Sequence, residues 1–356
     1  MTKIFNLYII RHVLASTLLV ILVMAALIFF TTLLGEFQDI GRGEYTFIQA
    51  FIYVLLLLPH NLYLFSPMLI LLGGIIGLGM LTTHQELMVI RSSGYSLRRI
   101  LVAVSYSAIL LIALMTILGE GLAPALDHKA ALRKQNAKNN GQAVLTASGL
   151  WLHEGNDFFH IDRVMAHRHL EGITRYEFDT HHQLMASYHA KTMDFQNNQW
   201  MLREVVKTEF VPQEGTRTSY ESLTYWNFTL NPSLLNVGLL VPEEMSLIHL
   251  LNFSRHLVQN GLQASQYQLA FWQRVLQPLA ILVMLFLAVP FVLNGPRSTL
   301  LGLRLLLGIV VGFIFYLCNA FLGQTSVIFQ FSPLFAAALP ILLFSGIGYS
   351  VLRRLR

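Results

Sequence analysis

Long runs of apolar residues occupy the first third and the last quarter of this chain. A helix needs about 20 consecutive apolar residues to cross the ~30 Å hydrocarbon core of a bilayer. Six segments meet this requirement, so the pattern predicts an α-helical membrane protein with six transmembrane helices. The predicted spans are residues 13–34, 47–81, 100–119, 275–293, 300–322 and 334–352.

The second run is too long for one straight span. It contains Pro59 and Pro67, and a proline inside a helix removes a backbone hydrogen bond. We therefore expect one tilted or kinked helix whose outer turn lies at the membrane interface. The first run is longer than the apolar core of a signal peptide, and no small-residue cleavage motif follows it, so it is predicted to be a retained anchor.

Between the third and fourth runs the pattern changes. Apolar and polar residues often alternate there, as in residues 159–164. Six short segments of this kind, separated by Gly, Asn and Asp turns, predict an all-β extracytoplasmic domain built as a sandwich or jelly roll. The predicted strands are residues 143–151, 158–164, 172–178, 184–195, 199–209 and 218–228.

The chain is thus predicted to divide into three parts. Residues 1–119 form transmembrane helices 1–3 and residues 266–356 form helices 4–6. Residues 120–265 form the β-jelly-roll domain, which is flanked by two helices at residues 125–138 and 246–260.

Composition supports this division and changes the meaning of the net charge. Only 12% of the 356 residues are charged and 54% are hydrophobic, which excludes a disordered regulator or an ordinary cytosolic enzyme. On one side of the spans, the loops hold ten Lys or Arg and a single acid, Glu86, so the positive-inside rule places both termini in the cytoplasm. The net charge of +5 is therefore a topology signal and not a sign of nucleic-acid binding.

No catalytic motif is present. The chain has no GxxxxGK[ST] phosphate loop and no HExxH, GxSxG or CxxC sequence, and its one cysteine, Cys318, excludes an intrachain disulfide. The histidines of the β-domain, such as His169 and His189, match no recurring zinc spacing. We expect them to be solvated residues of strands and loops, so no metal site is predicted.

Ionisable residues at the edges of the spans are more informative, because charge is costly there. The candidates are His60, Glu120 and Arg274. A bland interpretation exists for two of them. Arg274 can snorkel to the outer interface, and His60 can be an ordinary interfacial residue.

The loop between the second and third spans predicts a short helix over residues 82–91. Thr83 is placed to cap it, with Glu86 at the third helical position, as in a capping box. Leu87 and Ile90 would form an apolar ridge that suits docking into a groove on a partner protein. An interfacial helix lying on lipid is the alternative.

Spans one and five carry stripes of bulky apolar residues. Such stripes usually serve helix packing or lipid contact, and they also suit a wall that guides acyl chains. The residues are Phe29, Phe30, Leu33, Leu34 and Phe37 in span one and Phe313, Phe315 and Leu317 in span five.

Four segments, in order along the whole chain, resemble the LptF/LptG permease family of the lipopolysaccharide export system, and its LptG branch more than its LptF branch. They are residues 78–94 (LGMLTTHQELMVIRSSG), 149–164 (GLWLHEGNDFFHIDRV), 267–278 (YQLAFWQRVLQP) and 308–316 (GIVVGFIFY).

The resemblance implies a permease subunit of the bacterial inner membrane, with its β-domain in the periplasm and no cofactor of its own. It implies a second, LptF-like permease, whose spans and those of this chain enclose a cavity for lipopolysaccharide, with spans one and five as lateral gates. A separate LptB-like ATPase dimer would bind ATP and Mg. An LptC-like membrane-anchored protein and an LptA-like bridge would receive the lipid from the β-domain.

The resemblance also implies two sets of site residues. The loop helix would contact the ATPase, with Glu86 as the key contact, and Phe65 stands at a position that lines the cavity in relatives. The expected contacts to the ATPase are Glu86, Leu87, Ile90, Arg91 and Gly94; those to the lipid are Phe29, Phe30, Leu33, Phe37, Arg42, His60, Phe65, Arg133, Lys134, Phe313, Phe315 and Leu317.

The chain departs from the family where relatives carry lysines that meet the phosphates of lipid A. The matching positions of span one read Thr32, Gln38 and Asp39, and His60 replaces a basic residue of span two. Either nearby cations substitute, or the partner permease carries the charge, or the lipid is phosphorylated differently. The nearby cations are Arg42, Lys129, Arg133 and Lys134.

Two other classes of protein compete with a transport subunit. One is a membrane scaffold or sensor whose β-domain binds a periplasmic protein. The other is an integral membrane enzyme that acts on lipids. An enzyme would need acids, histidines or a nucleophile gathered at one membrane depth, and the sequence pattern indicates no such cluster.

Overall fold

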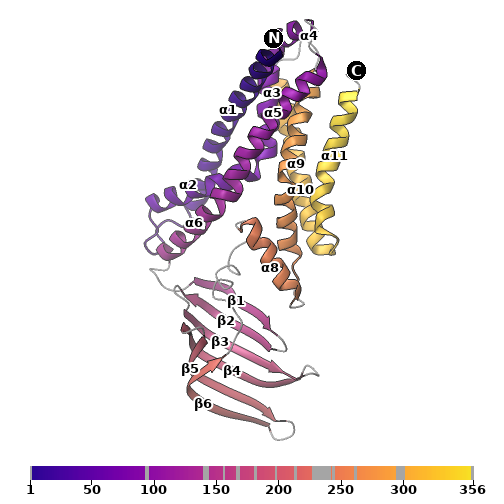
Figure 1. The fold of residues 1–356 in the computed structure, drawn as a ribbon. Helices are drawn as coiled ribbons and strands as arrows, with labels where there is room; N and C mark the ends of the chain where they lie inside the picture. The colour runs from indigo at the N-terminus through magenta and orange to yellow at the C-terminus, as the bar shows by residue number, and fades with distance from the viewer. Residues whose placement is uncertain are drawn as a thin grey trace.

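A computed structural model shows a long helical bundle joined to a single β-sheet, with both ends of the chain at the end of the bundle opposite the sheet (Figure 1). The structure describes residues 2–92, 96–138, 144–154, 157–165, 169–179, 183–196, 199–211, 215–226, 242, 245–259, 263–293 and 301–353.

The bundle is made of long helices. Among the described residues, seven helices are long and apolar enough to cross a membrane, and the six predicted spans account for all of them because the second is divided in two. The helices before the sheet are α1 (Thr2–Glu36), α2 (Phe47–Leu64), α3 (Ser66–Thr83), α4 (Glu86–Ser92), α5 (Leu97–Thr116), the π-helix η1 (Ile117–Leu122) and α6 (Ala123–Lys138), and those after it are α8 (Leu247–Gln259), α9 (Ser265–Leu293), α10 (Leu301–Phe329) and α11 (Pro333–Arg353).

The second predicted span is two helices, not the one kinked helix that we expected. Pro67 has no N–H to donate to the carbonyl of Tyr63 four residues earlier, so the series of helical backbone hydrogen bonds is interrupted here. The backbone turns at Phe65, which ends α2 and precedes α3. The free Tyr63 carbonyl accepts hydrogen bonds from Ser66 Oγ at 2.7 Å and from Gln277 Nε2 of α9 at 2.9 Å. The break is therefore stabilised by side chains and is part of the fold.

Helix α3 lies at the centre of the bundle and packs closely on α1. A Cβ atom added to Gly73 would lie 2.4 Å from Thr17 Cα, and one added to Gly77 would lie 2.5 Å from Ser16 Oγ. Ser16 Oγ in turn donates to the Gly73 carbonyl at 2.7 Å. Small residues at such an interface let two backbones approach, as is common between helices in membranes.

The predicted loop helix exists but begins later than expected. Helix α3 continues to Thr83, whose Oγ1 donates to the Gly79 carbonyl at 2.9 Å, so Thr83 is not a helix cap and the predicted capping box is wrong. Gln85, with φ of 60°, turns the chain, and α4 starts at Glu86. The apolar character of the preceding span extends α3 by a turn, which leaves only a short α4.

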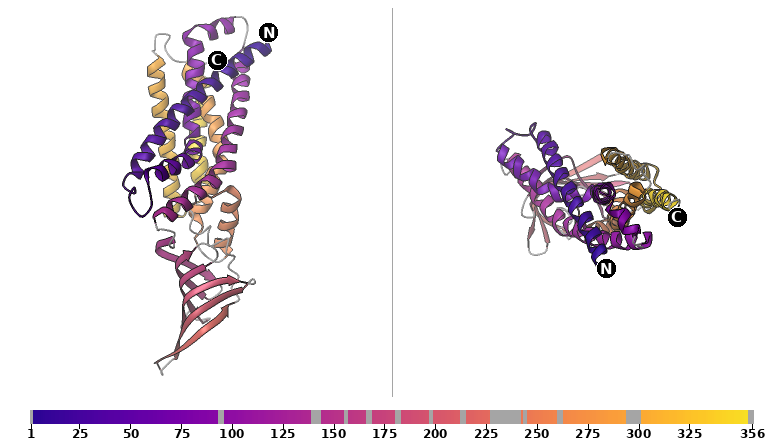
Figure 2. Two further views of the ribbon diagram at one scale, coloured as in Figure 1. Left: turned by 90° about the vertical axis from the view of Figure 1, so that its left-hand side faces the viewer. Right: turned by 90° about the horizontal axis from the view of Figure 1, so that it is seen from above.

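The six strands form one antiparallel sheet in the order β1-β2-β3-β4-β5-β6, so the predicted all-β domain is confirmed. The sheet is strongly twisted (Figure 2). Ile161 pairs with Ile173, and these residues belong to an apolar cluster that also contains Trp200 and Trp226. Each predicted strand overlaps one observed strand. The strands are β1 (Val144–Glu154), β2 (Asp157–Met165), β3 (His169–Phe178), β4 (Leu184–Gln196), β5 (Gln199–Val211) and β6 (Gly215–Trp226).

Two helices connect the sheet to the bundle (Figure 1). Helix α6 continues α5 through η1 and leads toward β1. Helix α8 packs against the first turns of α9, where the rings of Phe253 and Tyr267 lie 4.7 Å apart and Leu250 is fully buried. Both connections therefore meet the bundle at its sheet-facing end.

Candidate functional site

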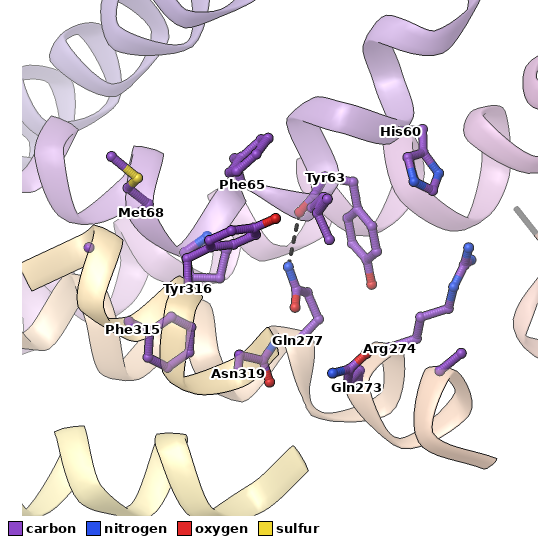
Figure 3. Close-up of a pocket in the computed structure, with 14 residues that line it drawn as sticks. His60, Tyr63, Phe65, Met68, Gln273, Arg274, Gln277, Phe315, Tyr316 and Asn319 are labelled. Carbon is purple, nitrogen blue, oxygen red and sulfur yellow. Dashed lines mark hydrogen bonds between the residues drawn. The ribbon is translucent and has the colours of Figure 1, made fainter. Parts of the chain in front are cut away.

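A pocket of about 80 Å³ opens where α2 breaks into α3, with α9 and α10 as its other walls. The side chains of Gln277, Tyr63 and Tyr316 converge on it from three helices (Figure 3). Its lining mixes apolar surface with amide, hydroxyl and basic groups. The lining residues are His60, Tyr63, Leu64, Phe65, Pro67, Met68, Ala270, Gln273, Arg274, Gln277, Gly312, Phe315, Tyr316 and Asn319.

Aromatic rings and one amide hold the pocket in shape. The rings of Phe65 and Tyr316 lie 5.2 Å apart across it, and Phe315 meets Phe344 of α11 edge-on at 5.2 Å. Gln277 Nε2 donates to the Tyr63 carbonyl, which is drawn as a dashed line in Figure 3, and to Ser66 Oγ at 3.1 Å. The helix break and the pocket wall thus depend on the same side chain.

Arg274, one of the basic groups of the pocket, is held by Glu120 of η1. Arg274 Nη1 donates to Glu120 Oε1 at 2.9 Å, and the Arg274 side chain is only 8% exposed. Glu120 Oε2 accepts a second hydrogen bond, from the backbone N–H of Leu247 at the start of α8, at 3.1 Å. The carboxylate therefore joins the pocket wall to both connections of the sheet. A π-helix at this point fits the frequent use of such turns at functional sites.

His60, the other basic group, is backed by a buried carboxylate. His60 Nδ1 lies 3.0 Å from Asp127 Oδ2 of α6, and the Asp127 side chain is fully buried. The contact has the distance of an ion pair without the angles of a hydrogen bond, and neither oxygen of Asp127 has another hydrogen-bond partner among the described residues. Because an isolated buried charge is very costly, the imidazole is the group that makes a carboxylate tolerable here.

Ion pairs connect the C-terminal end of α1, predicted to be its outer end, and the turn after it to α6. Lys134 Nζ lies 2.7 Å from Glu36 Oε1 and 3.2 Å from Asp39 Oδ2, and Lys138 also binds Asp39. The Tyr45 hydroxyl donates to Glu36 at 2.9 Å. Hydrogen bonds from Lys138 and Lys134 hold the pKa of the Asp39 carboxyl below its ordinary value. We call Glu36, Asp39, Tyr45, Lys134 and Lys138 the outer clasp.

The structure brings three of the predicted lipid contacts together and separates the rest. His60, Phe65 and Phe315 line the pocket. On α1, Leu33 and Phe29 pack into an apolar cluster with α2, whereas Phe30 and Phe37 are exposed. Arg133, Phe313 and Leu317 are exposed on α6 and α10, while Arg42 pairs with Asp39 and Lys134 belongs to the outer clasp.

The predicted coupling residues are also divided. Glu86 accepts a hydrogen bond from the Tyr8 hydroxyl at 2.8 Å. Leu87 is 2% exposed and packs into the bundle core, so it does not form an exposed ridge. The exposed apolar residues of α4 are instead Met88 and Val89. The side chains of Ile90 and Arg91 and all of Gly94 lie outside the described part of the structure.

Sequence reasoning missed most of the polar pocket residues. Gln273, Gln277 and Asn319 lie inside long apolar helices. An amide is unusual there, and this contrast with the apolar neighbours is the sequence feature that could have identified them. Asp127 was missed because the predicted extension helix appears polar throughout. The lining of the pocket is amphipathic, since it offers apolar walls together with hydrogen-bond donors and two paired basic groups.

These features define a class of protein: a multi-pass membrane subunit with a β-domain between two groups of helices and a pocket of mixed polar and apolar lining among the spans. The model of the family described as lipopolysaccharide export system permease LptF/LptG matches residues 7–354, and the chain belongs to this family.

Two curated relatives agree with this assignment. The LptG permease protein of Haemophilus influenzae is 33% identical over 343 residues, which cover 96% of this chain and 95% of that protein. The LptG permease protein of Escherichia coli K12 is 31% identical over 350 residues, covering 98% and 97%. The predicted resemblance, and its nearness to the LptG branch, are therefore confirmed. The chain is a multi-pass permease of the inner membrane.

Proposed function

We propose that this chain is the LptG-type subunit of an ATP-driven exporter that takes lipopolysaccharide from the outer leaflet of the inner membrane. The observation that carries the proposal is the pocket at the break between α2 and α3. It places aromatic walls (Phe65, Phe315) beside basic and amide groups (His60, Arg274, Gln277) within one cavity. That combination suits the junction between acyl chains and a polar head.

The energy source in this proposal is a separate ATPase subunit. The chain has no phosphate-loop sequence, and α4 presents Met88 and Val89 at the end of the bundle that carries both termini. The same end is rich in arginine, including Arg98, Arg99 and Arg353. We infer from the positive-inside rule that this end is cytoplasmic, so α4 is where an LptB-like dimer would bind.

The β-domain would then lie in the periplasm and pass the lipid onward. Its sheet is held together by a buried apolar cluster that includes Phe159, Ile161 and Trp200. Strands β1 and β6 are the edges of the described sheet, and an open edge can pair with strands of another protein. An LptF-like permease would complete the cavity, and LptC-like and LptA-like proteins would continue the route.

A photo-crosslinking experiment tests the transport proposal. A benzophenone analogue of phenylalanine replaces Phe65 in the pocket. A control variant carries the same analogue at position 335 of α11, where Phe335 is 68% exposed and does not line the pocket. After irradiation in cells, we expect a lipopolysaccharide adduct from position 65 and none from position 335.

The alternative is a membrane scaffold or sensor whose β-domain binds a periplasmic protein. It predicts protein adducts from the β-domain and no lipopolysaccharide adduct from position 65. Equal lipid adducts at both positions would show only contact with the bilayer, and would remove the pocket from the proposal.

A further inference from the structure

A second cavity, of about 280 Å³, lies elsewhere on the bundle. It is a groove between α5 and α11, with α9 as its floor, and it shares no residue with the pocket at the helix break. We call it the α5–α11 groove. It is lined by Leu101, Val283, Phe286, Leu287, Phe344, Ser345, Gly348, Tyr349 and Leu352.

The interior of the groove is apolar. Leu101, Phe286 and Phe344 supply its walls and floor, and Ser345 and Tyr349 are the lining residues with a hydroxyl. Gly348 keeps it open, because a Cβ atom there would already lie 3.3 Å from Leu287 Cδ1. This apolar interior therefore suits a single acyl chain.

The two walls end in arginines at the same end of the bundle. Arg98 and Arg99 precede Leu101 by less than one turn of α5, and Arg353 follows Leu352 at the end of α11. All three are exposed. The N-terminus of α5 adds its own partial positive charge at this end. The lining residues include no acid, so the mouth of the groove is basic.

An apolar groove with a basic mouth matches an anionic phospholipid. Basic pockets between transmembrane helices at the cytoplasmic surface are a known way to bind acidic lipid head groups. A lipopolysaccharide molecule would bring several acyl chains, and the groove has room for one.

We propose that the α5–α11 groove binds an anionic glycerophospholipid, with one acyl chain between α5 and α11 and the phosphate at Arg98, which shares the helix face of Leu101, and Arg353. The site shares no lining residue with the pocket that the transport proposal uses, although Phe344 of the groove contacts Phe315 of the pocket. Because α5 and α11 both pack on α9, a lipid that bridges them stabilises this side of the bundle.

The test uses the purified full-length permease with its co-purifying subunits, stripped of lipid in detergent. Phosphatidylglycerol, phosphatidylethanolamine or lipopolysaccharide is then added, and bound lipid is counted by native mass spectrometry. We expect one phosphatidylglycerol per chain, retained at least fivefold better than phosphatidylethanolamine. Lipopolysaccharide should not displace it. Displacement by lipopolysaccharide would overturn the assignment to a phospholipid.

Two variants locate the lipid. Gly348→Leu fills the groove, and Gly346→Leu is its matched control, because Gly346 has nothing within 4 Å and does not line the groove. The double variant Arg98→Gln/Arg353→Gln removes the positive charge at the proposed head-group site, with Arg11→Gln, exposed on α1, as its control.

We expect phosphatidylglycerol retention to fall at least fivefold in Gly348→Leu and in the arginine variant, and to stay unchanged in both controls. Equal retention in all four variants would overturn the proposal. The arginine substitutions are at exposed positions, so they decide the question even if Gly348→Leu fails to fold.

Discussion

The carboxylate of Glu120 lies 2.9 Å from the guanidinium of Arg274, and this pair joins the pocket wall to both connections of the β-sheet. Glu120 belongs to η1, which continues into α6, and its second oxygen binds the backbone N–H of Leu247 at the start of α8. A movement of the β-domain would reach the pocket through this carboxylate. The contact therefore joins the pocket wall to both segments that lead to the β-domain.

We expect Glu120→Ala to destabilise the protein by about 3 kcal/mol, since it leaves the buried Arg274 without its acid. This is the low end for a buried pair, because Glu120 itself is 21% exposed. Unfolding of the purified protein in mixed micelles measures the loss. Arg42→Gln is the control, since it breaks an exposed pair with Asp39 and should cost less than about 1 kcal/mol. Similar losses in both variants would contradict the role of Glu120.

The close packing of α1 on α3 makes a second prediction. Gly73→Ala would place a methyl group against the Thr17 backbone, which cannot move aside, so we expect a loss of about 1–3 kcal/mol. Gly35→Ala is the control, because nothing lies within 4 Å of Gly35 and alanine favours a helix. A thermal unfolding series checks both. A neutral Gly73→Ala would show that α1 is not held against α3 as described.

Local patterns predicted most of the elements, because hydrophobic periodicity depends on near neighbours in the chain. The spans and all six strands were found in this way. The same patterns did not predict the break at Phe65, although they include Pro67. Pro67 places the break, but part of its stabilisation comes from Gln277, which donates to the Tyr63 carbonyl from more than 200 residues away. Only the folded bundle brings these groups together.

The candidate site was predicted in part for the same reason. His60, Phe65 and Phe315 share a pocket, whereas Arg42 and Lys134 are occupied by acids of the outer clasp. The burial of Leu87 was not predicted because α4 has only 7 residues, about two turns, and such a short pattern does not show which face meets the bundle. Which side chain pairs with a given charged residue is decided by the tertiary fold, so the local sequence pattern does not predict it.

The outer clasp gives a prediction about pH. The folded-state pKa of Asp39 is lowered, chiefly by its hydrogen bond from Lys138, so its ion pairs contribute stability above the ordinary carboxyl pKa of about 4. That contribution is lost as the pH falls through the folded value. The difference in Tm between wild type and Asp39→Asn should therefore be largest near pH 6 and shrink toward pH 3. Glu204→Gln breaks an exposed pair with Lys191 and serves as the control, because such a pair contributes less than about 1 kcal/mol.

The exposed face of α4 gives a prediction about the partner ATPase. Val89→Glu places a charge on an apolar surface that is 66% exposed, so it should weaken co-purification with an LptB-like subunit at least tenfold without unfolding the chain. Glu86→Ala should weaken it too, but Glu86 also binds Tyr8, so a Tyr8→Phe control separates the two contacts. Normal co-purification and export in Val89→Glu and Glu86→Ala would exclude α4 as the docking element.

The pair of His60 and Asp127 predicts a strong coupling between two substitutions. His60→Leu alone leaves the fully buried Asp127 carboxylate without its nearby base, so we expect a loss of about 3 kcal/mol or more. Adding Asp127→Leu removes the charge that made the first change costly, and the double variant should recover at least half of the stability. Unfolding in mixed micelles of the wild type, both single variants and the double variant measures the coupling. Additive losses would mean that the two side chains do not act as a pair, and that His60 belongs to the pocket alone.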